Sequence, residues 1–253
     1  MPPPRRSSYA SALQAFNPGP WTRAVKWLIC ACAGVYVLEL IGFRGLIEQY
    51  LGLVPGLVID RFYVWQPVTY LFVHAGFFHI LFNMFVLWMF GVELERLWGT
   101  RFFLKFYFIC GIGAAAATLL ISVLPFSFAV PIYYSDTIGA SGALYGLLVA
   151  YALYFPEQPV YMYFLFPIKM KYFVLIIGAI AFFSSFSTAG GGIANVAHLG
   201  GLLVGYLYLS YLKGGGFHPL GELKYRYLKW KMNRLRRKFD VYSGGQPKDW
   251  DRH

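Results

Sequence analysis

The sequence contains few charged residues. Asp, Glu, Lys and Arg make up 13% of the 253 residues, whereas hydrophobic residues make up 58% and aromatic residues 20%. An average soluble domain has about a quarter of its residues charged. The mean hydropathy is +0.53. This shortage of charge argues against an ordinary water-soluble domain and predicts a protein that lies in a membrane.

Cysteine is also scarce. The three cysteines, Cys30, Cys32 and Cys110, all fall inside long apolar runs. Thiols at such positions are expected to act as small apolar core residues. We therefore predict no disulfide framework, no metal site and no cofactor.

Apolar runs recur along the whole chain and approach the length of about 20 residues that a helix needs to cross a bilayer. No separate apolar region precedes the first run, which is therefore expected to be an uncleaved anchor rather than a signal peptide. The sequence predicts an all-α membrane protein, a polytopic bundle of six transmembrane helices. The six predicted spans are residues 24–43, 77–92, 103–124, 139–155, 171–187 and 196–212. The expected division is a short N-terminal segment (1–22), a six-helix domain (23–212) and a basic C-terminal tail (213–253).

The Lys and Arg residues are unevenly placed, and this predicts the orientation. With six spans both termini lie on one side, and residues 213–253 carry eleven of the 22 Lys and Arg. Only Arg44 and Arg61 fall in the loops of the opposite side. Because cytoplasmic loops carry the excess of Lys and Arg, both termini are predicted to be cytosolic. The six-span plan favours a bacterial inner membrane, and an organelle membrane stays open.

The net charge of +11 comes largely from the basic tail. A basic segment directly after a membrane span is expected to lie against anionic lipid head groups, with its large apolar side chains toward the bilayer. Nucleic acid is the weaker alternative for such a stretch. The expected partners are therefore membrane lipids and no nucleic acid.

Several polar residues share one depth in the predicted bundle. His79 and Asn83 lie one helical turn apart at the outward end of the second span, and His74 precedes them. Ser141 begins the fourth span and His198 the sixth, and both also lie at the outward end. Polar residues inside membranes usually face the bundle interior and indicate a functional site.

These residue types at one depth predict acyl-transfer chemistry. His198 would remove the proton from Ser141, which is the minimum arrangement for a serine nucleophile. His79, Asn83 and the backbone N–H of Ser141 would donate to an oxyanion. No carboxylate lies near His198 in the sequence, so we predict a dyad. Tyr145, one turn after Ser141, is expected to pack against the imidazole.

Small residues predict a close approach of the fourth and sixth spans. Gly142 and Gly146 lie four residues apart on one span, and Gly201 and Gly205 lie four apart on the other. This spacing lets two helix backbones meet without intervening side chains. Gly139 and Gly142 would also leave room for a substrate backbone around the serine.

Each polar residue alone has a simpler explanation. Serine in a glycine-rich helix is more often a packing residue, and a single membrane histidine is often a satisfied contact within the bundle. His79 and Asn83 alone would pair with neighbouring helices. Their common depth on one side of the membrane favours a site.

The same residues fall in motifs that resemble those of the rhomboid family of intramembrane serine proteases. HAGFFHILFNM fits its H-x-x-x-x-H-x-x-x-N motif in span two, GASG fits G-x-S-G in span four, and AHLGGLLVG fits A-H-x-x-G-x-x-x-G in span six. FGVELERLWGTRFFLKFY resembles the junction between spans two and three, with Glu95 and Arg101 in place. Gln66 stands where arginine is common in the segment before span two. The resemblance covers residues 27–212.

The resemblance implies a six-span protease of bacterial type that cuts transmembrane segments of other proteins near their outward ends, after a small residue. Ser141 would be the nucleophile, His198 the general base and then acid, and His79 and Asn83 the oxyanion donors. Residues that would support the site are His74, Tyr145, Gly139 and Gly142. Residues with a structural role would be Glu95, Arg101, Gly201 and Gly205.

Two alternatives stay open at this point. One is a catalytically silent rhomboid-like protein that binds membrane proteins, although such relatives typically lack the serine or the histidine. The other is a transporter, which would carry more charged residues deep in the bundle than Glu39 alone. Within the protease interpretation, the fifth span and the glycine-rich loop at residues 190–192 are expected to form a lateral gate.

Overall fold

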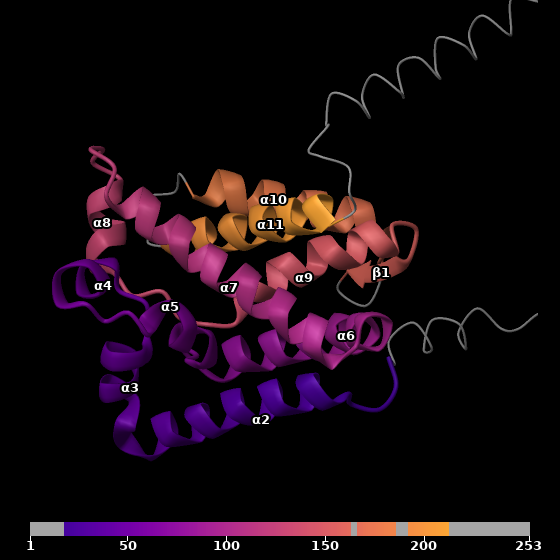
Figure 1. The fold of residues 1–253 in the computed structure, drawn as a ribbon, viewed down its shortest axis with the longest axis horizontal. Coiled ribbons are helices and arrows are strands. Elements are labelled where there is room, and N and C mark those ends of the chain that lie inside the picture. The colour runs from indigo at the N-terminus through magenta and orange to yellow at the C-terminus, as the bar shows by residue number, and fades with distance from the viewer. Residues whose placement is uncertain (1–17, 163–165, 186–191, 213–253) are drawn as a thin grey trace, which may run out of the picture. The chain divides into compact units, whose positions relative to one another are not determined.

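The structure is a computed structural model, and it describes residues 18–162, 166–185 and 192–212. The described residues are mostly helical (Figure 1). A helix lies at each of the six apolar runs. These helices are α2 (Arg23–Leu38), α6 (Phe77–Trp98), α7 (Thr100–Ser122), α9 (Ser141–Tyr154), α10 (Met170–Ser184) and α11 (Gly192–Leu212).

Within the described ranges, three helical stretches are long and apolar enough to cross a membrane: Arg23–Leu51, Phe77–Trp98 and Thr100–Ser122. The apolar helices α9 and α10 have 14 and 15 residues. At 1.5 Å per residue they are about 21 to 23 Å long, shorter than a hydrocarbon core of about 30 Å. The structure thus confirms a mostly helical protein with membrane-spanning helices, and the count of six spans stays a prediction.

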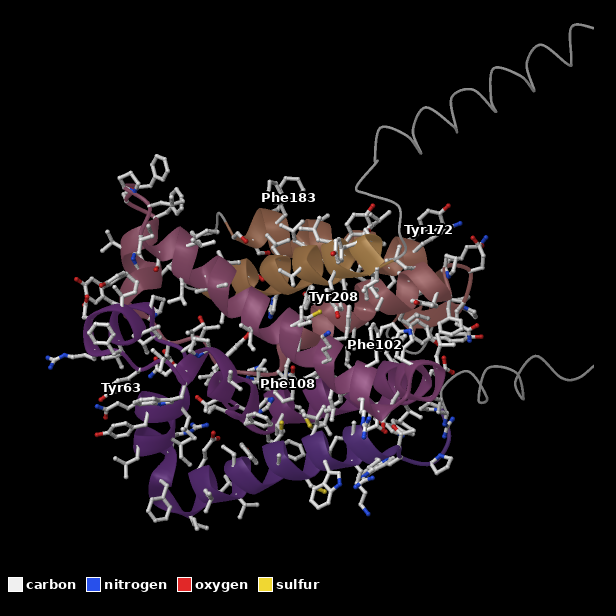
Figure 2. The ribbon with its side chains drawn as sticks, in the orientation of Figure 1. Tyr63, Phe102, Phe108, Tyr172, Phe183 and Tyr208 are labelled. Atoms are coloured by element: carbon white, nitrogen blue, oxygen red, sulfur yellow. The ribbon has the colours of Figure 1, made fainter. Side chains whose placement is uncertain are left out.

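Helix α9 lies at the centre of the packing. Its side chains are apolar and buried on every face from Gly142 to Tyr151, apart from the partly exposed Tyr145. A helix of this kind belongs to the core of a bundle, and α6, α7 and α10 all pack against it. In contrast, α10 exposes Tyr172 and Phe183, which point away from the neighbouring helices (Figure 2). Exposed aromatic side chains are expected where a helix faces lipid.

Helix α11 lies against α9 with almost no side chain between them. A Cβ atom added to Gly201 would fall on the carbonyl oxygen of Gly142, and one added to Gly205 would lie 2.9 Å from the Cα of Gly146. On another face of α11, Tyr208 stacks on Phe102 of α7 with ring centroids 6.3 Å apart (Figure 2). The glycines therefore allow the two backbones to touch.

Glu95 of α6 holds the start of α2. Its carboxylate accepts hydrogen bonds from the backbone N–H groups of Ala24 (2.9 Å) and Val25 (3.0 Å). It also accepts from the hydroxyls of Thr22 (2.5 Å) and Thr100 (2.7 Å). The first N–H groups of a helix lack partners within the helix, and the dipole there favours negative charge. One buried carboxylate thus joins α2, α6 and α7.

Arg101 does not take part in this junction. It is exposed in the first turn of α7 and makes no hydrogen bond or ion pair with the described residues. Arg96, near the end of α6, donates instead to the carbonyl oxygens of Pro18 (2.5 Å) and Pro20 (2.9 Å). Arg96 therefore ties the segment before α2 to the end of α6.

The long connection before α6 is folded rather than irregular. Gln66, which is fully buried, accepts a hydrogen bond from the Val54 N–H (3.0 Å) and donates to the Gln49 carbonyl (3.1 Å). Arginine has no acceptor and would not make both bonds. The elements here are the π-helix η1 (Glu39–Phe43), α3 (Arg44–Leu51), α4 (Pro55–Arg61), α5 (Gln66–Thr69) and the 3₁₀-helix η2 (Tyr70–Phe72), and α8 (Ala129–Tyr134) follows α7.

The expectation of an all-α chain is wrong at one point. Strands β1 (Pro159–Met162) and β2 (Phe166–Lys169) form an antiparallel hairpin between α9 and α10, in which Val160 pairs with Ile168. Strands of four residues carry too little periodic signal to be predicted from the sequence. Beside the hairpin, hydrogen bonds from Lys169 and Lys171 lower the pKa of the exposed Glu157 to about 2.

The glycine contact between α9 and α11 predicts a contrast between two substitutions. Gly201→Ala would force the backbones of α9 and α11 apart and should lower the free energy of unfolding by about 1–3 kcal/mol or more. Gly34→Ala in α2 is the control, because a Cβ there meets nothing within 4 Å. It should be neutral or stabilising by up to about 1 kcal/mol. Unfolding in mixed detergent micelles would measure both; equal stabilities would contradict the packing argument.

Candidate active site

Ser141 and His198 are brought together by the contact of α9 with α11. Ser141 is the first residue of α9, and His198 lies in the second turn of α11. The His198 Nε2 atom lies 2.7 Å from the Ser141 Oγ atom, within hydrogen-bond distance. Both residues are partly buried, so the pair is not sealed from solvent. The Nδ1 atom of His198 is buried and has no hydrogen-bond partner among the described residues.

Tyr145 packs on the His198 ring. The two rings are nearly parallel, with an interplanar angle of 5° and centroids 4.4 Å apart. Tyr145 lies one turn after Ser141 on the same helix, so a single helix presents both the hydroxyl and the surface against which the imidazole lies. The stacking limits rotation of a ring that no carboxylate among the described residues orients.

Gly139 shapes the backbone before Ser141. Its φ angle is +119°, a conformation that residues with a Cβ rarely adopt. A Cβ at this position would lie 2.7 Å from His79 Nε2 and 3.8 Å from Ser141 Oγ. The Gly139 N–H donates to the Tyr70 carbonyl (2.9 Å), which holds the turn. A residue with a side chain would therefore not fit at this position beside the His79 ring.

His79 presents its Nε2 atom to this position. Its Nδ1 atom accepts a hydrogen bond from the Ala75 N–H (3.2 Å). The ring of His74 packs edge-on against His79, with centroids 5.2 Å apart. His74 is fully buried, and this burial, with a smaller contribution from His79, lowers the pKa of His74 to about 4. His74 is therefore neutral at pH 7, and its Nδ1 atom lies 3.2 Å from the Phe72 carbonyl oxygen.

Asn83 is buried one turn below His79, and its amide is partly used within its own helix. The Asn83 Nδ2 atom donates to the His79 carbonyl (2.7 Å), and Oδ1 has no partner among the described residues. Because a carbonyl only accepts, the amide nitrogen is the atom that faces it. One amide N–H remains for a ligand. Asn83 makes no hydrogen bond with Ser141 or His198 in the described part of the chain.

Sequence reasoning did not identify every residue around the site. Glu39 was noted only as a charged residue in a span, and Arg44 only as an outward positive charge. The structure places both beside the residues that precede His79. A buried acidic residue in an apolar run was the only signal that pointed to this contact.

The fold and the Ser141–His198 pair define a helical membrane protein with a serine and histidine site. Comparison with known proteins gives the same class: residues 61–214 match the family model described as "Rhomboid domain". The chain therefore belongs to the rhomboid family. Helix α2 precedes the matched region.

Relatives come from bacteria and eukaryotes. "Rhomboid protein 1, mitochondrial" of Saccharomyces cerevisiae is 29% identical over 195 residues, which cover 74% of this chain and 54% of that protein. "Rhomboid protease GluP" of Bacillus subtilis is 33% identical over 156 residues, 60% of this chain and 27% of that protein. "Rhomboid protease GlpG" of Yersinia pseudotuberculosis is 28% identical over 205 residues, 81% of this chain and 66% of that protein. The chain thus spans about half of the first relative's length and about a quarter of the second's.

The ring stacking at His198 predicts unequal effects of two substitutions at Tyr145. Tyr145→Phe keeps the ring and should leave the rate of Ser141 phosphonylation by a fluorophosphonate near the original value. Tyr145→Ala frees the imidazole and should lower the rate about tenfold or more, because misplacement of a catalytic group by about 1 Å can cost about 100-fold. Intact-mass spectrometry over time would measure the rates. Equal rates in the two variants would show that stacking does not position His198.

Proposed function

We propose that the protein is an intramembrane serine endopeptidase in which Ser141 is the nucleophile and His198 the general base. The observation that carries this proposal is the 2.7 Å contact between Ser141 Oγ and His198 Nε2. Support also comes from membership of the rhomboid family and from relatives whose names describe them as rhomboid proteases.

The proposed reaction follows from the positions of these groups. His198 Nε2 accepts the hydroxyl proton while Ser141 Oγ attacks the peptide carbonyl, and the oxygen of the tetrahedral intermediate carries the negative charge. His198 then gives the proton to the leaving amine as the peptide bond breaks. Water attacks the resulting acyl-enzyme, again losing its proton to His198, and the second product leaves with restoration of the serine hydroxyl.

Stabilisation of the oxyanion is assigned to three donors. They are the Nε2–H of His79, the backbone N–H of Ser141 and the free amide N–H of Asn83. Ser141 lies at the start of a helix, where N–H groups lack helical partners and the dipole favours negative charge. Preorganised donors at such a position commonly contribute about 100-fold or more to the rate.

The proposed substrates are transmembrane segments of other proteins. A peptide bond must reach Ser141 in an extended conformation, and membership of the rhomboid family favours a small residue before the cut. Because α9 is short and buried in the bundle, its first residue would lie below the membrane surface, which suits a bond near the outward end of a substrate helix.

Orientation and location follow from the placement of charge. We place both termini in the cytosol and the site toward the outward face, since Lys and Arg collect on one side. The proposed membrane is a bacterial inner (cell) membrane or an organelle membrane, because the relatives include a bacterial protein and one named as mitochondrial. The basic tail, with its proposed contact to anionic lipids, lies outside the described residues, as do residues 190 and 191 of the proposed gate loop.

Reaction with a fluorophosphonate tests the dyad without knowledge of the substrate. The protein in liposomes should gain one phosphonyl group on Ser141, whereas Ser141→Ala and His198→Ala should gain none. Intact-mass and peptide mapping would show the modification and its position. Single-span test proteins with small residues at their outward ends, placed in the same liposomes, should be cut only by the protein that is labelled.

Two other results would contradict the proposed dyad. A protein that is neither labelled nor active in lipid would be a catalytically silent relative that binds membrane proteins. Labelling of Ser141→Ala to the same extent would show that the reactive residue is elsewhere.

Removal of the Asn83 amide tests its part in the oxyanion site. Asn83→Ala should lower the maximal rate of Ser141 phosphonylation about 100-fold, because the phosphonyl oxygen occupies the oxyanion position. Thr118→Ala is the matched control, since Thr118 makes the same kind of bond to the carbonyl four residues earlier in its helix (3.0 Å to Ala114). Thr118→Ala should be phosphonylated at the rate of the unaltered protein. An unchanged rate in Asn83→Ala would remove the amide from this role.

A further inference from the structure

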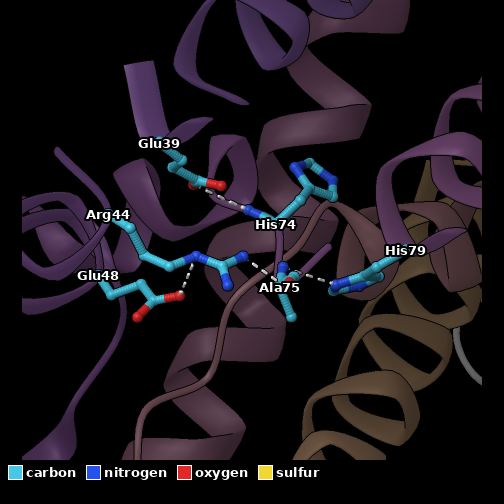
Figure 3. Close-up of polar contacts among 6 residues, drawn as sticks. All are labelled: Glu39, Arg44, Glu48, His74, Ala75 and His79. Atoms are coloured by element: carbon cyan, nitrogen blue, oxygen red, sulfur yellow. Dashed lines mark hydrogen bonds and ion pairs between the residues drawn. The ribbon is translucent and has the colours of Figure 1, made fainter. Parts of the chain in front are cut away.

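Glu39 is a buried carboxylate that the Ser141–His198 chemistry does not use. Its residue exposure is 4%, and it begins the π-helical turn η1 at the end of α2. Its Oε1 atom accepts a hydrogen bond from the His74 backbone N–H (3.3 Å), as Figure 3 shows. Its Oε2 atom has no partner among the described residues. A poorly paired carboxyl in a membrane helix is costly, so its contact with His74 indicates a specific use.

Arg44 binds Ala75, the residue that follows His74. Its guanidinium donates through Nη2 to the Ala75 carbonyl (2.5 Å) and through Nε to Glu48 (3.4 Å) (Figure 3). The segment that follows α2 therefore contributes two side chains to one short stretch of backbone: a carboxylate from η1 at the His74 N–H and a guanidinium from α3 at the Ala75 carbonyl. Between them lies Gly42 with a φ angle of +112°, so the chain bends between Glu39 and Arg44.

The His74–Ala75 backbone, which Glu39 and Arg44 hold in this way, contacts the ring of His79. The Ala75 N–H donates to His79 Nδ1 (3.2 Å). An amide N–H only donates, so Nδ1 must be the unprotonated nitrogen of the neutral ring, and the proton lies on Nε2. Nε2 is the atom that faces Gly139 beside Ser141. In the other tautomer this atom would present a lone pair to the developing oxyanion.

We propose that Glu39 and Arg44 are positioning residues that hold the His74–Ala75 backbone, so that the Ala75 N–H keeps His79 in the tautomer protonated on Nε2. They touch neither Ser141 nor His198 and act on the site only through His79. The catalytic benefit rests on the proposed function, whereas the tautomer is a property of the folded protein alone. The segment from η1 to α3, which precedes the region matched by the family model, thus contributes to the site through these contacts.

Two kinds of measurement test the proposal. Nitrogen NMR of protein labelled with ¹⁵N-histidine, with the His79 signal identified by its loss in His79→Gln, reports which ring nitrogen is protonated. The concentration dependence of Ser141 phosphonylation by a fluorophosphonate separates the maximal rate from the concentration needed for half of it. A residue that merely stabilises the fold would not change the tautomer of His79.

Arg44→Gln and Glu39→Leu are the informative variants, with Arg61→Gln and Asp60→Asn as matched controls on the same outward segment. We expect mixed His79 tautomers in the first two, and a maximal rate about tenfold lower or more with the half-maximal concentration little changed. Glu39→Gln keeps an acceptor for the His74 N–H and should restore most of the rate. The controls should match the unaltered protein.

Defined outcomes would overturn the proposal. These are an unaltered His79 tautomer in both Arg44→Gln and Glu39→Leu, a rate in Glu39→Gln as low as in Glu39→Leu, or an equal loss in the controls. If Glu39→Leu does not fold, Arg44→Gln still tests the proposal, because the Arg44 side chain is exposed. If the unaltered protein is never labelled, the proposed function fails, and the NMR result still decides whether these residues position His79.

Discussion

The contact of α9 with α11 through glycine is the constraint on which the site depends. A serine side chain is short, so its hydroxyl reaches an imidazole on another helix only where the two backbones nearly touch. Gly142 and Gly201 provide this approach, because a Cβ on Gly201 would overlap the Gly142 carbonyl. The 2.7 Å contact between Ser141 and His198 then follows at the end of the same interface where α9 begins. Packing and chemistry are thus parts of one helix pair.

The remaining polar side chains near the site contact backbone atoms and an aromatic ring rather than carboxylates. Tyr145 limits the His198 ring by stacking, and the Ala75 N–H and the Phe72 carbonyl contact His79 and His74. Two buried carboxylates contact backbone groups away from the serine and histidine side chains. Glu95 anchors the start of α2 at the other end of the bundle, and Glu39 contacts only the His74 backbone. In an apolar surrounding, each buried polar group needs a partner, and the backbone supplies most of them.

Much of the helical plan could be predicted, because a membrane helix shows itself as a long apolar run. The predicted second span ended at residue 92, whereas α6 continues to Trp98, since the charged residues Glu93, Glu95 and Arg96 interrupt the run without ending the helix. The hairpin after α9 and the short helices before α6 were not predicted, because segments of four to eight residues carry little periodic signal.

The sequence by itself determined the residue types and their order, and it predicted a common depth for them. It placed Ser141, His198, His79 and Asn83 at one end of their helices because apolar runs and charge placement define direction across a membrane. Only the tertiary structure decided which atoms meet: Arg96 rather than Arg101 at the helix junction, Glu39 at the His74 backbone, and the Nδ1 of His79 at Ala75. Helical periodicity is a local property of the chain, whereas hydrogen-bond partners depend on how separate elements pack against one another.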